Sequence, residues 1–142
     1  MQKVLRFKDV NKCLGCFTCM NVCSAVNEKN HSLNKSAISV RTTGGMASRF
    51  VVVVCLGCLD PACMEVCPSD ALVHRKGGGV LLEKEKCIGC RACEESCIMR
   101  AVNFDEETQM PIICRHCGVC TKFCPHSCLQ MIETEEALVN AI

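Results

Sequence analysis

Residues 114–125 read CRHCGVCTKFCP, a run of four cysteines spaced C-x2-C-x2-C-x3-C and closed by proline. The same spacing occurs at two other places, and a fourth run reads C-x2-C-x4-C-x3-C. Together the runs contain all but one of the 17 cysteines in the 142-residue chain. The quartets are Cys13, Cys16, Cys19 and Cys23; Cys55, Cys58, Cys63 and Cys67; Cys87, Cys90, Cys93 and Cys97; and Cys114, Cys117, Cys120 and Cys124. Such regular repetition indicates a shared chemical task rather than an accident of composition.

The spacing within each quartet is typical of ligands to a [4Fe–4S] cluster. Each of the four irons needs one thiolate, and a C-x2-C-x2-C loop brings three thiolates onto one small surface. Backbone N–H groups of such a tight loop also point inward, where they offset the negative charge of the cluster. In proteins with two clusters, the fourth cysteine of a run reaches across to the other cluster, so quartets work in pairs. We therefore expect four [4Fe–4S] clusters, with iron held by the sixteen quartet cysteines.

Two other uses of cysteine fit this sequence less well. Zinc sites combine C-x2-C pairs across a long loop, whereas each run here gathers its cysteines within a few residues of one another. A disulfide framework suits small secreted domains, and residues 1–8 contain no apolar run long enough for a signal peptide. The apolar residues between the quartets, including the run at residues 51–54, also argue against a metallothionein-like metal store.

The composition predicts that metal clusters stabilise the fold. Trp and Tyr are absent and Phe occurs 5 times, so a large aromatic core is not available. Small chains of this kind depend on additional staples, and we expect the metal-free chain to be largely unfolded. Four oxidised clusters held by thiolates would lower the formal net charge from +1 to about −7, which argues against a nucleic-acid partner.

The sequence also favours a cytoplasmic protein without direct membrane insertion. No apolar stretch approaches the ~20 residues that cross a membrane, and the tail at residues 133–142 is too short and too acidic for an anchor. Because no address signal is found and the thiols must stay reduced, we expect the cytoplasm of an organism with anaerobic metabolism. Export of the folded chain, attached to a partner that carries the signal, is the alternative.

Short strands are expected between the quartets. Turn residues at 75–79, 105–109 and Gly44-Gly45 separate apolar segments that are too short for helices. The β-branched run at residues 50–54 predicts a buried strand. The expected strands lie within residues 37–41, 50–54, 69–74, 80–83, 101–104, 110–113 and 126–132.

Residues 55–68, CLGCLDPACMEVCP, resemble the second motif of the four-cluster electron-transfer subunits that accompany molybdenum and tungsten oxidoreductases. That family includes the iron–sulfur subunits of dimethyl sulfoxide reductases, formate dehydrogenases and formate-linked hydrogenases, and the small subunits of tungsten aldehyde oxidoreductases. The segments CIGCRAC at 87–93, FDEET at 104–108 and PIIC at 111–114 are similar to the same group. The resemblance covers about residues 10 to 132.

This resemblance implies an α+β fold of two pseudo-symmetric, bacterial-ferredoxin-like modules, each with two [4Fe–4S] clusters. The modules would be nested, with residues 1–48 and 108–142 forming the outer module and residues 49–107 the inner one. The short spacing between the third and fourth quartets leaves another pairing open. The implied ligand sets are Cys13, Cys16, Cys19 and Cys124; Cys114, Cys117, Cys120 and Cys23; Cys55, Cys58, Cys63 and Cys97; and Cys87, Cys90, Cys93 and Cys67.

The same resemblance implies a non-catalytic subunit that relays single electrons through its clusters. One partner would be a catalytic tungsten or molybdenum pterin subunit, such as an aldehyde oxidoreductase or formate dehydrogenase, or a hydrogenase. The other would be a ferredoxin or a second redox subunit. The sequence has no radical-SAM motif, Gly-rich dinucleotide fingerprint or Ser/His/Asp constellation that would support an independent enzyme. The alternatives are a free-standing polyferredoxin and a cluster-stapled scaffold of a self-associating redox filament.

Several residues depart from the family pattern or lie outside the quartets. Proline is missing after Cys23 and Cys97, so we expect looser turns there. We interpret Cys128 as a small buried residue rather than as a further ligand or redox switch. His116 is expected to tune a cluster by hydrogen bonding or to face solvent. Surface or structural roles are expected for His31, His74, His126, Asp60, Glu94 and Glu95. The chain is also shorter than most members of the family, which favours the small subunit of a soluble enzyme.

Overall fold

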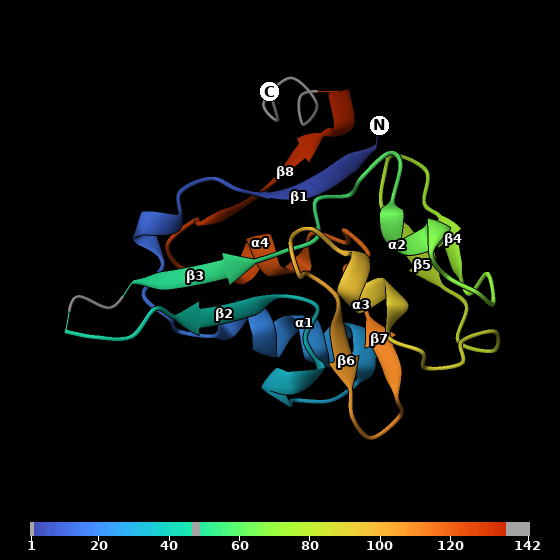
Figure 1. Ribbon diagram of the computed structural model, residues 1–142. Helices are drawn as coiled ribbons and strands as arrows, with labels where there is room; N and C mark the ends of the chain where they lie inside the picture. The colour runs from blue at the N-terminus through green and yellow to red at the C-terminus, as the bar shows by residue number, and fades with distance from the viewer. Residues whose placement is uncertain (1, 47–48, 136–142) are drawn as a thin grey trace.

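The computed structural model describes residues 2–46 and 49–135 and contains short helices, short strands and connecting loops (Figure 1). The predicted α+β class is therefore confirmed. Residues 1, 47–48 and 136–142, which belong to the predicted outer module and its acidic tail, lie outside the described residues. Within the two described ranges, no helix is both long and apolar enough to cross a membrane.

The described strands form two-stranded antiparallel sheets. The pairs are β1 (Lys3–Phe7) with β8 (Leu129–Glu133), β2 (Ser39–Thr42) with β3 (Phe50–Val53), β4 (Leu72–His74) with β5 (Val80–Leu82), and β6 (Asn103–Asp105) with β7 (Met110–Ile112). The last three pairs are the hairpins that the turn residues predict. The β1–β8 pair instead joins the two ends of the chain, with Leu5 opposite Met131.

Each of the helices α1 to α4 begins inside a cysteine run. The helices are α1 (Thr18–Glu28), α2 (Ala62–Glu65), α3 (Ala92–Ser96) and α4 (Val119–Phe123), with 3-10 turns η1 (Val10–Lys12) and η2 (Leu33–Lys35). The second residue of each α-helix is the third cysteine of its quartet. Phe17, Arg91 and Gly118 precede three of these helices with positive φ angles, whereas the longer second loop enters α2 through Pro61 without one.

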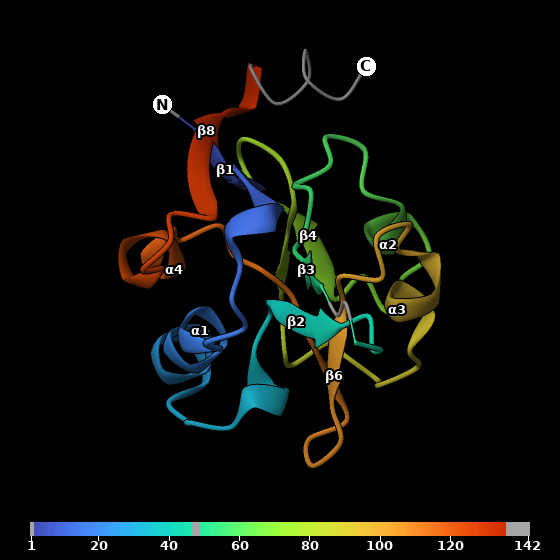
Figure 2. The same ribbon diagram turned by 90° about the vertical axis from the view of Figure 1, so that its left-hand side faces the viewer.

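The helices pack in pairs, α1 against α4 and α2 against α3. Figure 2 shows the first pair on one side of the molecule and the second pair on the other. Two groups of buried apolar residues accompany the pairs. The larger group includes Leu5, Ile38, Val40, Val52 and Val54, and the smaller one contains Leu72, Val80, Cys93 and Val102.

The run at residues 50–54 forms a strand as predicted, but only one of its faces is buried. Val52 and Val54 are 6% and 0% exposed, whereas Val51 between them is 44% exposed. Successive side chains of a strand point to opposite faces, and the two-stranded β2–β3 sheet has a core on one face alone. The predicted strand is therefore confirmed, and its burial is confined to one face.

The looser turns expected after Cys23 and Cys97 are also not found. The N–H groups of Arg100 and Ala101 donate to the carbonyl oxygen and Sγ of Cys97 at 3.1 and 3.4 Å, as Asp70 and Ala71 do to Cys67 at 3.4 and 3.3 Å. Ile98 thus permits the turn that proline forms elsewhere. After Cys23 there is no turn, because α1 continues to Glu28. Helix α1 is the longest helix described, and proline at position 24 would have interrupted it.

Candidate cluster-binding sites

The loop between the first and second cysteine of each quartet has one shared backbone feature. The residue directly before the second cysteine has a positive φ angle, 69° at Gly15, 62° at Gly57, 70° at Gly89 and 55° at His116. This conformation turns N–H groups toward the first cysteine. The N–H groups of Gly57 and His116 donate to Sγ of Cys55 and Cys114, both at 3.4 Å. Such amides stabilise a thiolate and hence a bound metal cluster.

The fourth cysteines of three quartets lie in equivalent turns. The N–H of the residue four positions later donates to Sγ, from Ala71 to Cys67, from Ala101 to Cys97 and from Cys128 to Cys124 at 3.4 Å. Burial alone would raise the pKa of Cys67 and Cys124, but the backbone amides of the turn outweigh it and lower both values. These turns therefore favour the thiolate that a metal requires.

Cys128 takes the place that alanine has in the other two turns. It is 4% exposed, close to the 1% of Ala71 and the 3% of Ala101. Burial and the neighbouring Cys124 raise its pKa to about 12, so its thiol stays protonated. The prediction of a small buried residue is confirmed, and the side chain also lines a cavity with Cys124.

The structure brings cysteines from different quartets together. Three cavities are each lined by three cysteines of one loop and the fourth cysteine of another quartet. Their cysteines are Cys13, Cys16, Cys19 and Cys124 (set A, with Cys128 beside it); Cys55, Cys58, Cys63 and Cys97 (set C); and Cys87, Cys90, Cys93 and Cys67 (set D). Cys23, Cys114, Cys117 and Cys120 are here called set B.

The pKa values of buried cysteines show which other cysteines lie near them, both within set B and between the four sets. Burial raises the pKa of Cys120 to about 12, and the charges of Cys23, Cys117 and then Cys19 add to this. Burial likewise raises the pKa of Cys114 to about 12, with additions from Cys55, Cys23 and Cys120. Cys63, with a pKa raised to about 11 chiefly by burial, also responds to Cys93. The packing agrees, because Cys19, Cys120, Cys114 and Cys55 belong to the larger buried group and Cys63 and Cys93 to the smaller one. Sets A and B, B and C, and C and D are therefore neighbours in that order.

Among the described residues, the thiols that line each cavity are not gathered around a single point. Tetrahedral zinc holds its thiolates about 2.3 Å from the metal, which draws the four sulfurs together around a single point. Among residues 2–46 and 49–135, no three His, Cys, Asp or Glu side chains converge closely enough to hold one ion. Four thiols from two loops around one cavity, with backbone amides that donate to cysteine sulfurs, instead match the ligand set of a cubane cluster.

His116 is buried between the central sets B and C, so the alternative that it faces solvent was wrong. His116 is only 4% exposed, and its Nδ1 accepts a hydrogen bond from the backbone N–H of Leu5 at 3.0 Å. The ring fills space beside two glycines: a Cβ atom on Gly57 or Gly79 would lie 3.1 Å from its Nε2. Burial, followed by the charges of Arg75 and Arg6, lowers its pKa to about 4. The imidazole is therefore neutral and carries its proton on Nε2.

Replacing His116 by glycine, which stands at the matching position of the other three loops, should destabilise the protein without removing a ligand. The variant leaves a cavity beside Gly57 and an unpaired N–H on Leu5, at a cost of about 2–4 kcal/mol. Anaerobic guanidinium unfolding of the iron-loaded protein measures this change. The exposed control His31→Gly should shift the free energy of unfolding by about 1 kcal/mol or less. Equal effects of the two substitutions would contradict the packing role of His116.

The remaining histidines and acidic residues that the sequence singles out lie at the surface. His31 and His74 are exposed, and the ring of His74 contacts the carbonyl oxygen of Leu59 at 2.6 Å. His126 is exposed beside set A, and Asp60 and Glu95 are exposed as well. Glu94 instead accepts a hydrogen bond from Arg91 at 3.2 Å.

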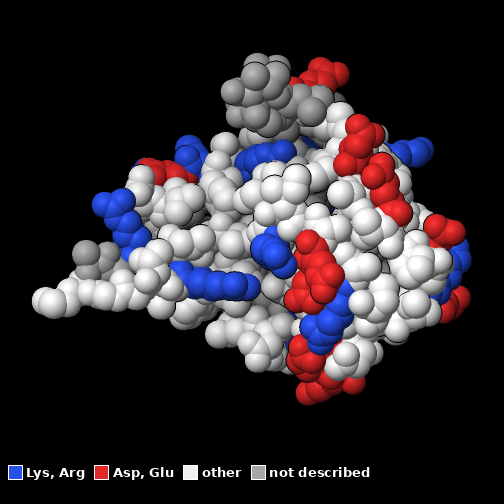
Figure 3. Space-filling model, in the orientation of Figure 1, with Lys and Arg blue, Asp and Glu red and all other residues white. Residues whose placement is uncertain are grey.

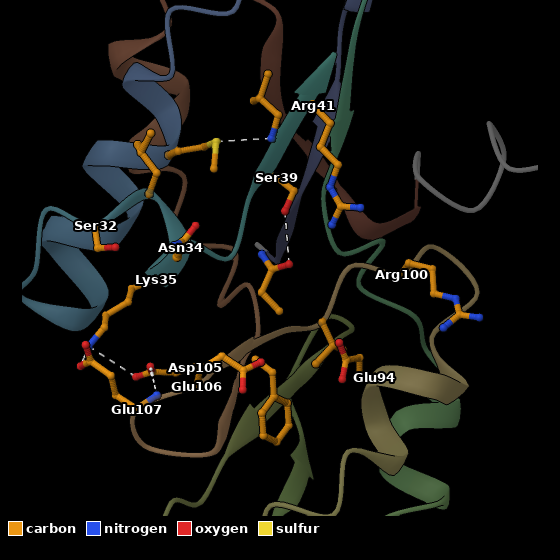
Figure 4. A pocket seen from close by; sticks show the side chains of 16 residues that line it. Ser32, Asn34, Lys35, Ser39, Arg41, Glu94, Arg100, Asp105, Glu106 and Glu107 are labelled. Carbon is orange, nitrogen blue, oxygen red and sulfur yellow. Dashed lines mark hydrogen bonds and ion pairs between the residues drawn. The ribbon is translucent and has the colours of Figure 1, made fainter. Parts of the chain in front are cut away.

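A polar groove of about 660 Å³ lies between η2, β2 and the β6–β7 hairpin, and no sequence motif predicts it (Figure 4). Lys35 reaches across it to Glu107 at 2.7 Å and to Asp105 at 3.6 Å. At the start of β2, the hydroxyl of Ser39 donates to the side-chain oxygen of Asn103 at 3.2 Å. No cysteine lines this groove, and its paired charges join the β6–β7 hairpin to η2. Its contacts are therefore structural.

Comparison with known protein families agrees with this geometry. A model of the 4Fe-4S dicluster domain matches residues 46–139, about two thirds of the chain. The chain belongs to this family. As a 4Fe-4S dicluster protein it has the ferredoxin-like architecture and iron–sulfur chemistry that the quartets predict.

Several relatives of this dicluster protein are subunits of oxidoreductases. The chain is 32% identical to the beta subunit of an NADH-dependent phenylglyoxylate dehydrogenase from Aromatoleum evansii, over 89% of this chain and 29% of that protein. It is 27% identical to a probable anaerobic dimethyl sulfoxide reductase chain of Escherichia coli, over 92% of this chain and 73% of that protein. A thiosulfate reductase electron transfer subunit of Salmonella typhi is 24% identical to it, over 93% of this chain and 77% of that subunit.

These relatives confirm the predicted resemblance to electron-transfer subunits of oxidoreductases. The chain spans less than a third of the length of the Aromatoleum protein, and about three quarters of the other two. The dicluster family therefore provides the fold and the cofactor type, while the partner must be inferred for this chain itself.

Proposed function

We propose that this dicluster protein is a non-catalytic electron-transfer subunit that holds four [4Fe–4S] clusters in a row. Sets A, B, C and D each supply four thiolates, as the nested pairing of quartets requires. The single observation that carries the proposal is the packing of the sets against one another. Cys19, Cys120, Cys114 and Cys55 belong to one buried group, and Cys63 and Cys93 belong to the other. A bound [4Fe–4S] cluster accepts and releases one electron at a time.

The chain itself sets the positions of the proposed clusters, stabilises their negative charge and shields them from water. Buried thiols in set B, at Cys23, Cys114 and Cys120, exclude water from the middle of the row. Amides from Gly57 and His116 donate to thiolates and thereby stabilise the anionic site. The second cysteine of every loop is exposed, at Cys16, Cys58, Cys90 and Cys117, which brings each set close to the surface.

The nested modules are supported by the pairing of secondary structure. Packing of α1 against α4 combines the first quartet with the last, and the β1–β8 pair holds the same two parts of the chain together. Packing of α2 against α3 combines the two middle quartets. We infer an outer module from residues 1–48 and 108–142 and an inner one from 49–107. Val52 of β3 and the following Val54, which fall in the inner range, nevertheless pack in the core of the outer part.

The proposed partners are a catalytic oxidoreductase subunit and a second redox protein. The dimethyl sulfoxide and thiosulfate reductase relatives support a molybdenum or tungsten pterin enzyme as the first. Formate dehydrogenase, aldehyde oxidoreductase and hydrogenase subunits belong to the same proposal, as does a cytoplasmic location.

Anaerobic purification of the tagged chain from its native host tests the subunit role. We expect stoichiometric molybdenum or tungsten in the purified complex, and reduction of the iron–sulfur chromophore by the substrate of the catalytic subunit. A chain that purifies alone, with reducible clusters and without either metal, would instead be a free polyferredoxin. Turnover that survives the loss of single clusters would favour a scaffold.

A further inference from the structure

The charged residues of the chain are distributed unequally along the row of cysteine sets. Residues 1–49 contain eight Lys and Arg but two Asp and Glu, whereas residues 50–107 contain six Lys and Arg and ten Asp and Glu. Figure 3 shows the same inequality in space, with Lys and Arg spread over the half that carries β2 and β3 and most Asp and Glu on the other half. Set A lies in the basic part and set D in the acidic part.

Both ends of the row expose an aliphatic side chain beside the second cysteine. Leu14 next to set A is 66% exposed, and Ile88 next to set D is 67% exposed. These residues occupy the same position, directly after the first cysteine of a loop. In the central sets, Leu56 is only partly exposed and Arg115 is charged. At this position of the loop, an exposed aliphatic side chain is therefore a feature of the two terminal sets.

The surroundings of Leu14 form what we call the Leu14 surface, made of Leu14, Phe17, Lys8, Lys12 and Arg49. Phe17 is 37% exposed in the same loop. Arg49 precedes Phe50, whose ring lies against Gly15. Lys8 donates its N–H to the carbonyl oxygen of Cys128, which lines the cavity of set A, at 2.8 Å. Lys12 directly precedes Cys13.

The cations of the Leu14 surface are available to a partner. Within the described chain, neither Lys8 nor Arg49 has a carboxylate within 4.0 Å, and Lys12 has only a long, exposed contact to Asp9 at 4.0 Å. The cations near Ile88 are already paired. Lys86 binds Glu83, Lys84 binds Glu28 at 3.4 Å, and Arg91 binds Glu94 and Glu106 at 3.2 and 2.8 Å.

We propose that the Leu14 surface docks a small acidic electron-carrier protein next to set A. Transient redox complexes are small, and complementary charges around the contact accelerate encounter more than they increase affinity. Exposed Leu14 in the loop of exposed Cys16 provides such a contact, because among the described residues Lys8 and Arg49 are unpaired and Lys12 has only its long contact to Asp9. The proposal rests on the proposed function, and it assigns the acidic Ile88 end to a different partner.

The experiment uses the iron-loaded chain and a reduced, strongly acidic two-cluster ferredoxin as the probe. Lys8→Glu with Arg49→Glu reverses the charge of the Leu14 surface. Lys29→Glu with Lys76→Glu is the matched control, because these exposed residues give the same change in net charge at the end of α1 and in the β4–β5 turn. Stopped-flow absorbance gives the second-order rate constant of electron transfer at 20 and 300 mM salt.

We expect the wild-type rate constant to fall about tenfold between low and high salt. In the Leu14-surface variant, the rate constant at low salt should be about tenfold lower than in wild type and should depend little on salt. The rate constant of the control variant should stay within about twofold of wild type. Equal decreases of the rate constant in the two variants would overturn the proposal, because the decrease would then depend on the net charge of the chain and not on this surface. A rate independent of salt in wild type would overturn it as well.

Three further measurements separate this proposal from its rivals. Reduction by a small viologen donor should proceed equally in all variants, since it needs no docking surface. Chains without reducible clusters would instead refute the proposed function itself. If the Leu14-surface variant lost binding to phosphatidylserine vesicles, or lost self-association in sedimentation, but kept the wild-type rate with ferredoxin, the surface would serve a membrane or a second copy and the proposal would fail.

Discussion

The double variant Cys97→Ala with Cys58→Ala is expected to lose one cluster, whereas Cys97→Ala with Cys117→Ala should damage two. Cys97 and Cys58 line the same cavity, so removing both thiols affects set C alone. Cys117 belongs to set B, as the neighbours of Cys120 indicate. Spin integration of the fully reduced protein should therefore give about three intact four-iron clusters in the first variant and about two in the second.

The opposite result would favour the other pairing that the sequence leaves open. If the third quartet exchanged its fourth cysteine with the last quartet, Cys97 and Cys117 would share a cluster. The Cys97/Cys117 double variant would then lose one cluster, and the Cys97/Cys58 variant would lose two. Iron analysis of the same samples checks that lost spins reflect lost clusters. Cys128→Ala is the matched control, because it removes a buried thiol beside set A that we assign no iron, and it should keep all four clusters.

Removal of iron is expected to unfold most of the chain. The fully buried large side chains are few, chiefly Leu5, Ile38, Val4, Val54 and Val80. Several members of the apolar groups are themselves cysteines, including Cys23, Cys114 and Cys120. A domain with such a small core depends on metal for its folding free energy. Anaerobic chelation should therefore abolish most of the far-ultraviolet circular dichroism of the helices and strands.

Reconstitution with iron and sulfide is the control for chemical damage, and it should restore the spectrum. A metal-free chain that keeps its native spectrum and unfolds cooperatively would contradict the view that clusters hold the fold together. It would also imply that pairs such as β1 with β8 are stable without help from the bound metal.

The sequence predicts the local parts of this molecule well because their causes are local. Cysteine spacing determines where the helices begin, since the third cysteine of every quartet is the second residue of a helix. Glycines at positions 77–79 adopt positive φ angles and produce the β4–β5 turn that the Gly-Gly-Gly run predicts. The predicted hairpins at β4–β5 and β6–β7 follow from such short-range signals.

The features that the sequence missed depend on contacts across the chain. Strand β1 forms because Val4 and Leu5 bury their side chains when paired with β8, more than a hundred residues away. The burial of His116 requires space beside Gly57 and Gly79, which no local pattern reveals. The length of α1 was predictable in principle, because Ser24 replaces the proline that would have ended the helix.

Iron and acid-labile sulfide per chain, measured on anaerobically purified protein together with redox-titrated EPR, test the central claim most directly. Four sets of four thiolates predict about sixteen iron and sixteen sulfide per chain, with coupled low-potential signals from neighbouring clusters. About eight of each would show that only two of the sets hold clusters and that the row is interrupted. Stoichiometric zinc with little iron would contradict the electron-transfer account altogether.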